Sequence, residues 1–142
     1  MCQRLAAYPI PETLHHEDFH DANIYVDDGH YVFSDWGESG VAHPFCTLLV
    51  TSRVIAWRLE LAPAAPELVR LRDIYLEPWT RYASRKELIA AYDLAYQVGM
   101  VCRALTWHRL LAGAETQFKA EYAEAVSGWL REFLEAATEP TA

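Results

Sequence analysis

The sequence predicts a mainly helical α+β domain in which one β-hairpin precedes about four helices. The chain has 142 residues, 52% of them hydrophobic, which is enough for one domain with its own core. Two β-prone runs flank an Asp-Gly pair near residue 28, and from Pro44 onward apolar residues recur at helical spacing. We therefore expect a single domain over residues 1–142, with a loop-and-hairpin segment at 1–40 and a helical subdomain at 41–142.

The hairpin is the strongest local prediction. Residues 24–26 and 31–33 are β-prone, and Asp28-Gly29 between them is favoured in two-residue turns, where both central residues take positive φ. The segment that follows, SDWGESG at residues 34–40, consists largely of glycine and small polar residues, which indicates a loop.

The rest of the chain is predicted to be helical. The helices are expected at residues 45–59, 66–76, 84–111 and 116–136. The PAAP sequence at 63–66 separates the first two, because proline interrupts helical hydrogen bonding. Ser84 followed by Glu87 has the form of a capping box and should open the longest helix. The tail at residues 139–142 is expected to fray.

Charge and composition exclude several classes of protein. A formal net charge of −8 disfavours nucleic-acid binding, which needs clustered Lys and Arg. The first residues, MCQRLAAYPIPETL, lack the apolar core expected of a signal peptide, and no apolar run is long enough to span a membrane. Cys2, Cys46 and Cys102 are odd in number and form no CxxC pair, as in reduced cytosolic proteins. We expect a cytoplasmic protein that contacts neither nucleic acid nor membrane.

The stretch HHEDFHDAN at residues 15–23 fits two different kinds of site. As HExxH it offers His16 and His20 as zinc ligands and Glu17 as a base, provided that it is helical. A β-prone run begins at Ile24, which leaves little more than two turns for such a helix. The same stretch also fits the catalytic loop of a phosphotransferase, with an aspartate at 18 and an asparagine five residues later.

Phosphoryl transfer makes further demands, and the sequence meets them. The reaction needs a carboxylate near the acceptor hydroxyl and oxygen ligands for the Mg²⁺ that bridges the phosphates. Asp18 can supply the carboxylate. Asn23 and Asp35 flank the predicted hairpin, so its two strands should bring both side-chain oxygens to the same end.

The run HHEDFHDANIYVDDGHYVFSDWGES resembles the catalytic core of the aminoglycoside phosphotransferase family. That core reads roughly H-G-D-x-H-x-x-N-[IV]-[LF]-V, a turn, and [IV]-D-[WF]. His20, two residues after the aspartate, and Trp36, after the second aspartate, separate this family from ordinary protein kinases. The resemblance implies a protein-kinase-like C-terminal lobe that transfers the ATP γ-phosphate to a hydroxyl of a small molecule.

By this resemblance Asp18 is the catalytic base or hydroxyl-orienting group, and His16 and His20 brace the loop around it. Asn23 and Asp35 are the implied ligands of Mg²⁺ and, through it, of the bound ATP. The acceptor is expected to be an aminoglycoside, a macrolide, choline, homoserine or a sugar amine. Nothing in the sequence selects among these.

The sequence departs from the family pattern at several positions. Glu17 stands where the family has glycine, and Asp21 and Ala22 replace a common Pro-Gly. Only fifteen residues precede His16, and no G-x-G-x-x-G is present, so the N-terminal nucleotide lobe is expected to be absent.

We therefore expect a C-terminal lobe that is inactive alone. Its exposed lobe surface would associate with a missing N-terminal lobe or with another copy of the chain. The alternative from another class is a non-catalytic remnant that binds a partner or a metabolite.

Overall fold

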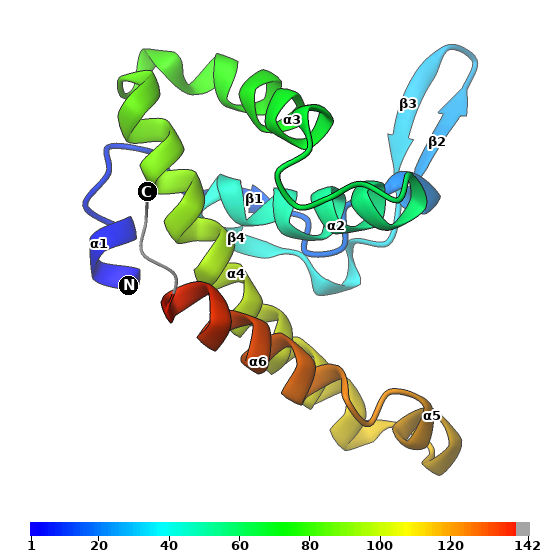
Figure 1. The fold of residues 1–142 in the computed structure, drawn as a ribbon. Coiled ribbons are helices and arrows are strands. Elements are labelled where there is room, and N and C mark those ends of the chain that lie inside the picture. Colours follow the sequence, from blue (N-terminus) through cyan, green and yellow to red (C-terminus); the bar gives the residue numbers. More distant parts are fainter. Residues whose placement is uncertain (139–142) are drawn as a thin grey trace. The chain divides into compact units, whose positions relative to one another are not determined.

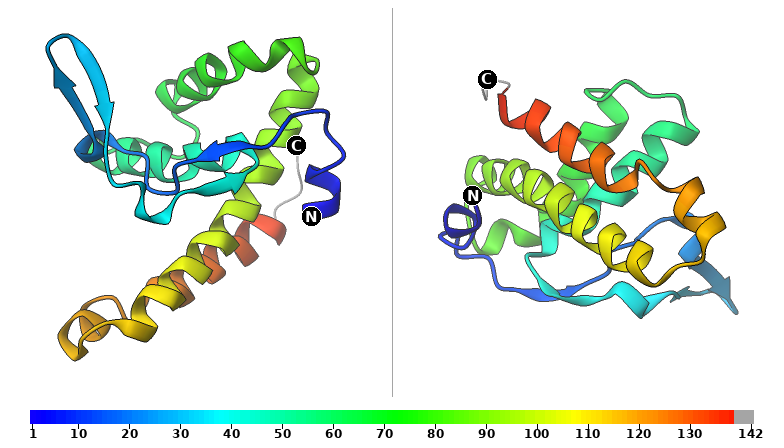
Figure 2. Two further views of the ribbon diagram at one scale, coloured as in Figure 1. Left: turned by 180° about the vertical axis from the view of Figure 1, so that it is seen from behind. Right: turned by 90° about the horizontal axis from the view of Figure 1, so that it is seen from below.

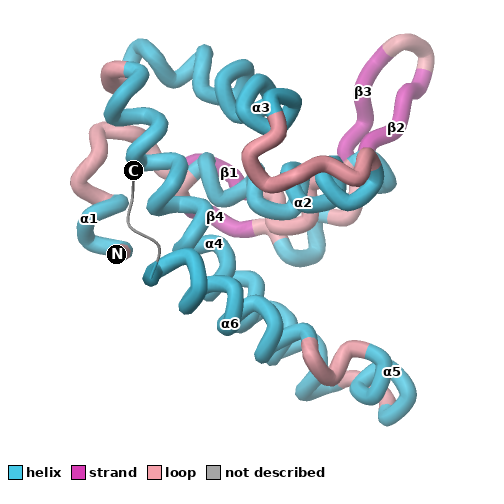
Figure 3. Tube along the Cα trace, in the orientation of Figure 1, coloured by secondary structure: helices cyan, strands magenta, loops and turns pink. Residues whose placement is uncertain are grey.

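The computed structural model describes residues 1–138 and has a mainly helical α+β architecture, as the sequence predicts (Figure 1, Figure 3). The helices are α1 (Cys2–Leu5), α2 (Leu48–Arg58), α3 (Pro66–Leu76), α4 (Arg85–Gly113), α5 (Thr116–Glu121) and α6 (Ala125–Thr138). The strands are β1 (Thr13–His15), β2 (Ile24–Asp27), β3 (His30–Phe33) and β4 (Gly40–Ala42). Short 3-10 turns form η1 (Asp21–Asn23), η2 (Trp36–Glu38), η3 (Pro44–Thr47) and η4 (Glu77–Arg81). The fraying expected at residues 139–142 lies outside the described residues.

The chain forms two compact units, Met1–Tyr96 and Gln97–Ala142, and the boundary between them falls within α4. Among residues 1–138, no helix combines the length and apolar character that crossing a bilayer requires.

The predicted hairpin is confirmed. Strands β2 and β3 pair antiparallel with Ile24 opposite Phe33 and Asp27 opposite His30. Asp28 and Gly29 at its tip have φ values of 45° and 77°, as a two-residue turn with two positive φ angles requires. The hairpin extends away from α2 and α3 (Figure 1).

A second small sheet was not predicted. Strand β1 pairs antiparallel with β4, with Leu14 opposite Val41. The predicted loop at residues 34–40 therefore ends one residue inside a strand. The sheet places His15 against η3, where its Nδ1 lies 2.8 Å from the Thr47 hydroxyl.

Aromatic and aliphatic side chains from η3, α2, α3, η4 and α4 form the core of the first unit. Phe45 is fully buried, with its ring centroid 5.6 Å from that of Trp79 and 6.1 Å from that of Tyr75. The Tyr75 hydroxyl donates to Pro44 O at 2.8 Å, and burial raises the pKa of Tyr75 to about 12. The other buried apolar residues of this unit are Leu5, Ile10, Leu48, Leu49, Val50, Leu76, Leu88, Ala91, Leu94 and Ala95.

The capping box before α4 is present as predicted. The Ser84 backbone N–H donates to Glu87 Oε2 at 2.9 Å, and the Glu87 N–H donates to Ser84 Oγ at 3.4 Å. Each side chain thus satisfies a backbone donor that the helix itself leaves unpaired.

The prediction of one final helix over residues 116–136 is wrong, because α5 and α6 replace it. Helix α5 ends where the Tyr122 ring stacks on Trp107, with centroids 5.0 Å apart, and Phe118 lies 4.6 Å from Tyr122. This ring cluster turns the chain back, and α6 then runs beside the second half of α4 (Figure 1, Figure 2). Gln97 of α4 donates to Ala136 O of α6 at 3.3 Å.

Protonation of His43 should lower the free energy of unfolding in mild acid. Its Nδ1 accepts the Phe45 N–H at 3.3 Å, which caps η3, and its Nε2 is buried without a hydrogen-bond partner among the described residues. Burial lowers the pKa of His43 from 6.5 to about 4. The unfolded chain binds a proton on this residue near pH 6.5, whereas the folded protein binds it only near pH 4. This contribution to stability is therefore complete above pH 6.5 and is lost as the pH falls toward 4.

Urea unfolding at pH 7 and pH 5 checks this expectation against His43→Asn. Asparagine keeps a capping oxygen but does not titrate. The wild type should lose more stability between the two pH values than the variant, and equal losses would contradict the assignment to His43.

Candidate functional site

The candidate site lies in the first unit, in the loop between β1 and β2 and in the turn after β3. The segment from His16 to His20 is an irregular turn, followed by η1. His16 is 5% exposed, and its Nδ1 accepts the Asp18 N–H at 3.3 Å. Its Nε2 therefore carries the proton and donates to Ser34 O at 2.8 Å. One buried imidazole thus joins the start of the loop to the residue that follows β3.

The hairpin closes the other side of the site. The Ser34 N–H donates to Asn23 O at 3.0 Å, next to the Ile24–Phe33 pair that begins the ladder. Asn23 and Ser34 therefore lie opposite each other at the base of the hairpin, and Asp35 follows directly. The hairpin register therefore places Asn23 opposite the residue that immediately precedes Asp35.

Asp18, His20 and Asn23 are linked by short polar contacts. His20 Nδ1 accepts the Ala22 N–H at 3.3 Å, so its Nε2 carries the proton and faces Asp18 Oδ2 at 3.3 Å. The Asn23 amide nitrogen donates to Asp18 O at 2.9 Å, and its 3.5 Å approach to His20 Nε2 is much longer. With the nitrogen of Asn23 engaged by the loop, its Oδ1 is the end of the amide that can bind a ligand.

Asp35 has a left-handed backbone, with φ 60° and ψ 56°. This conformation is uncommon for a residue with a side chain and is often found at functional sites. Its neighbours are fixed: the Trp36 indole N–H donates to Phe33 O at 2.8 Å, and the Trp36 ring lies 4.7 Å from the His16 ring. Asp35 itself is exposed, next in sequence to the anchored Trp36.

The oxygens of Asn23 and Asp35 suit a hard cation such as Mg²⁺. This ion prefers oxygen ligands and usually keeps several waters, so one or two protein ligands are sufficient when substrate phosphates supply the rest. Within residues 1–138, no three His, Cys, Asp or Glu side chains group closely enough to hold a metal by themselves. A self-sufficient protein cage is therefore not present in that range, whereas a site completed by phosphates fits the donors.

The geometry that the HExxH interpretation requires is missing. His16 and His20 are not on a helix, so they do not project from one helical face. Both ring nitrogens of His16 also have protein partners, Asp18 N and Ser34 O. The same nine residues instead form the loop with Asp18 and Asn23.

Helix α2 holds the loop through two residues that sequence reasoning missed. The Thr51 hydroxyl donates to Phe19 O at 2.6 Å, and Arg58 pairs with Asp21 at 2.5 Å. Thr51 and Arg58 are seven residues apart, which places them on the same helical face. These contacts span 32 and 37 residues of sequence, so no local pattern indicated them.

No family model matches this chain, and no curated protein or solved structure matches it significantly.

Proposed function

We propose that this chain is the C-terminal catalytic lobe of a small-molecule kinase of the aminoglycoside phosphotransferase kind, which uses ATP and Mg²⁺. The observation that carries the proposal is the hairpin register, which sets Asn23 beside the residue before Asp35. The same loop holds Asp18 within 3.3 Å of His20. A carboxylate beside two oxygen ligands is the arrangement that phosphoryl transfer requires.

In the proposed reaction, the acceptor hydroxyl oxygen attacks the γ-phosphorus of ATP. The bond to the β–γ bridging oxygen breaks, ADP leaves, and the Asp18 carboxylate accepts the hydroxyl proton. The His20 contact limits rotation of that carboxylate, whose side chain is 26% exposed and so accessible to a substrate. Mg²⁺, when bound, neutralises charge on the phosphates, and Asn23 and Asp35 are the residues that would hold it.

The hairpin supports the expectation of a nucleotide lobe. Val26 and Tyr31 form a cross-strand pair that is 69% and 73% exposed, and Tyr25 and Val32 on the other face are 55% and 45% exposed. Apolar side chains on both faces of a two-stranded sheet are typical of a surface that a further structure covers. The same observation favours the second candidate, a non-catalytic remnant that binds a partner through this hairpin.

The acceptor is proposed to be a hydroxyl-bearing small molecule, of the classes that the resemblance implies. We also propose a cytoplasmic location. Within residues 1–138 none of the cysteines forms a disulfide, which is usual in a reducing compartment.

Metal binding separates the two candidates on this chain. Mn²⁺, a spectroscopic substitute for Mg²⁺, should bind in the presence of ADP, and Asp35→Asn should weaken it about tenfold or more because an anionic ligand is lost. The matched control is Asp28→Asn, which removes the same charge from another exposed residue with positive φ, at the hairpin tip.

Free Mn²⁺ measured by electron paramagnetic resonance gives both affinities. Equal affinities in the two variants would favour the non-catalytic remnant.

A further inference from the structure

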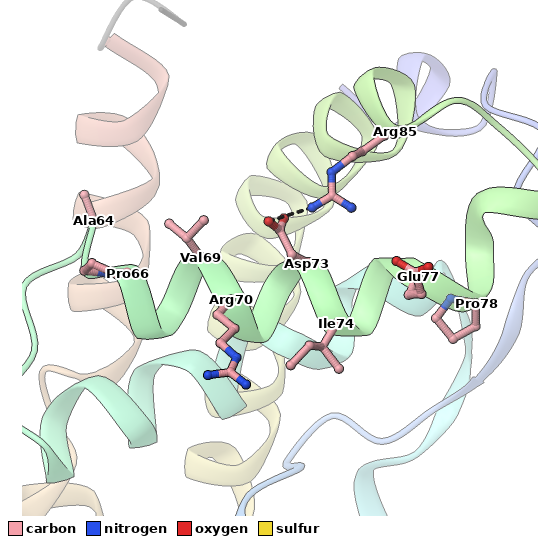
Figure 4. Close-up of a pocket in the computed structure, with 9 residues that line it drawn as sticks. All are labelled: Ala64, Pro66, Val69, Arg70, Asp73, Ile74, Glu77, Pro78 and Arg85. Atoms are coloured by element: carbon pink, nitrogen blue, oxygen red, sulfur yellow. Dashed lines mark ion pairs between the residues drawn. The ribbon is translucent and has the colours of Figure 1, made fainter.

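A groove of about 810 Å³ lies along α3, and none of the candidate site residues is among those that line it (Figure 4). It is lined by Ala64, Pro66, Val69, Arg70, Asp73, Ile74, Glu77, Pro78 and Arg85. Ile74 is 62% exposed and Val69 is 39% exposed, although both are aliphatic. On another face of α3, the Tyr75 ring lies 6.1 Å from that of the fully buried Phe45, whereas Val69 and Ile74 on the groove side stay exposed.

The charges on this groove are balanced. Asp73 pairs with Arg72 at 2.9 Å and with Arg85 at 2.7 Å. Arg70 and Glu77 are exposed and have no ion-pair partner among residues 1–138. The lining thus contains two cationic and two anionic side chains, although the whole chain has a net charge of −8. Because the charges of the groove cancel, two copies can approach each other there without strong repulsion.

The residues are also arranged symmetrically along the helix. Arg70 lies in α3, and Glu77 directly follows the helix with φ −53° and ψ −50°, so it continues the helical path about two turns further on. The midpoint between them falls between Asp73 and Ile74. Val69 and Pro78 have the same midpoint. An antiparallel copy of α3 centred there would place each Arg70 against the other copy's Glu77 and the two exposed Ile74 side chains against each other.

We propose that this groove is the interface of a symmetric homodimer in which the two α3 helices pack antiparallel. A twofold interface must be self-complementary, and opposite charges at equal distances from one point meet that condition. The Asp73 carboxylates near the axis are already neutralised by Arg72 and Arg85 within each copy. Each copy's Arg70 pairs with Glu77 of the partner subunit, which gives two equivalent ion pairs. The two Ile74 side chains lie between them. The dimer does not depend on phosphoryl transfer.

Sedimentation velocity over a range of protein concentrations tests this interface. We expect a monomer–dimer equilibrium in the wild type. Arg70→Glu and Glu77→Arg should each raise the dissociation constant about tenfold or more, because each places like charges together at two symmetric positions. The double variant Arg70→Glu/Glu77→Arg should restore the wild-type constant.

Two control variants make the result specific. Glu67→Arg changes the charge by the same amount as Glu77→Arg, but Glu67 lies near the start of α3 and does not line the groove. Val26→Ser reduces the exposed apolar surface of the hairpin. Both should leave the dimer unchanged, and circular dichroism should show every variant folded. A monomeric wild type, a dimer that the single reversals do not weaken, a double variant that is not restored, or loss of the dimer in Val26→Ser overturns the proposal.

Discussion

Replacing Asp18 with asparagine is expected to lower the rate of phosphoryl transfer by about 10²–10⁴-fold, the usual contribution of a positioned general base. Asparagine has nearly the same shape as aspartate, and its side-chain oxygen can still accept from His20 Nε2. The loop contacts from Asn23 and His16 involve the Asp18 backbone, so they remain. The variant therefore loses the proton acceptor while keeping the loop.

The rate is measured with ATP, Mg²⁺ and a panel of hydroxyl-bearing acceptors, in a form of the protein that includes an N-terminal nucleotide lobe. Asp27→Asn is the control, since Asp27 is an exposed carboxylate in β2, near the hairpin tip. Mn²⁺ affinity should be nearly unchanged in both variants. Transfer by Asp18→Asn at the rate of Asp27→Asn would remove Asp18 from the mechanism.

Replacing Phe45 with alanine is expected to lower the free energy of unfolding by about 3–5 kcal/mol, as for large buried side chains in general. Phe45 is 0% exposed and packs edge-on against His43, Tyr75 and Trp79. These rings come from separate elements, so the cavity left by the substitution has no single side chain that can fill it.

Urea denaturation followed by circular dichroism measures this loss. Trp57→Ala is the control, because Trp57 is also a large aromatic residue but is 78% exposed. It should change stability by no more than about 0.5 kcal/mol. Similar losses in both variants would show that the packing around Phe45 is not the main core of the first unit.

Local signals in the sequence were sufficient for the elements that depend on nearest neighbours. The Asp28-Gly29 turn was predictable because few residue pairs accept two positive φ angles. The start of α4 was predictable because Ser84 and Glu87 cap each other over three residues. Neither depends on the rest of the fold.

Elements that depend on distant contacts were not predictable. Strands β1 and β4 have three residues each, too few for an alternating pattern, and the exposed Leu14–Val41 pair gives no buried face to detect. The end of α5 depends on the stacking of Phe118 and Tyr122 with Trp107, a contact that helical periodicity does not encode. Helical periodicity alone therefore predicted one helix where the structure has α5 and α6.

In the candidate site, too, local features were predictable from the sequence and distant contacts were not. The pairing of Asn23 with Ser34, the residue before Asp35, followed from the spacing of the hairpin. The roles of Thr51 and Arg58 did not, because a hydroxyl or guanidinium on a helix gives no sign of which distant loop it contacts. Asp21 is a carboxylate where the aminoglycoside phosphotransferase pattern commonly has proline. That difference alone did not indicate which of the basic residues of the chain would pair with it.

The most direct test of the proposed metal–nucleotide site is the location of bound Mn²⁺. Paramagnetic broadening of backbone amide signals, recorded with ADP present, reports which residues lie near the ion. We expect the strongest broadening in residues 18–23 and 34–37, at the base of the hairpin, and its loss in Asp35→Asn. Broadening centred on Asp27 and Asp28 at the hairpin tip, or none in the loop, would contradict the proposed site.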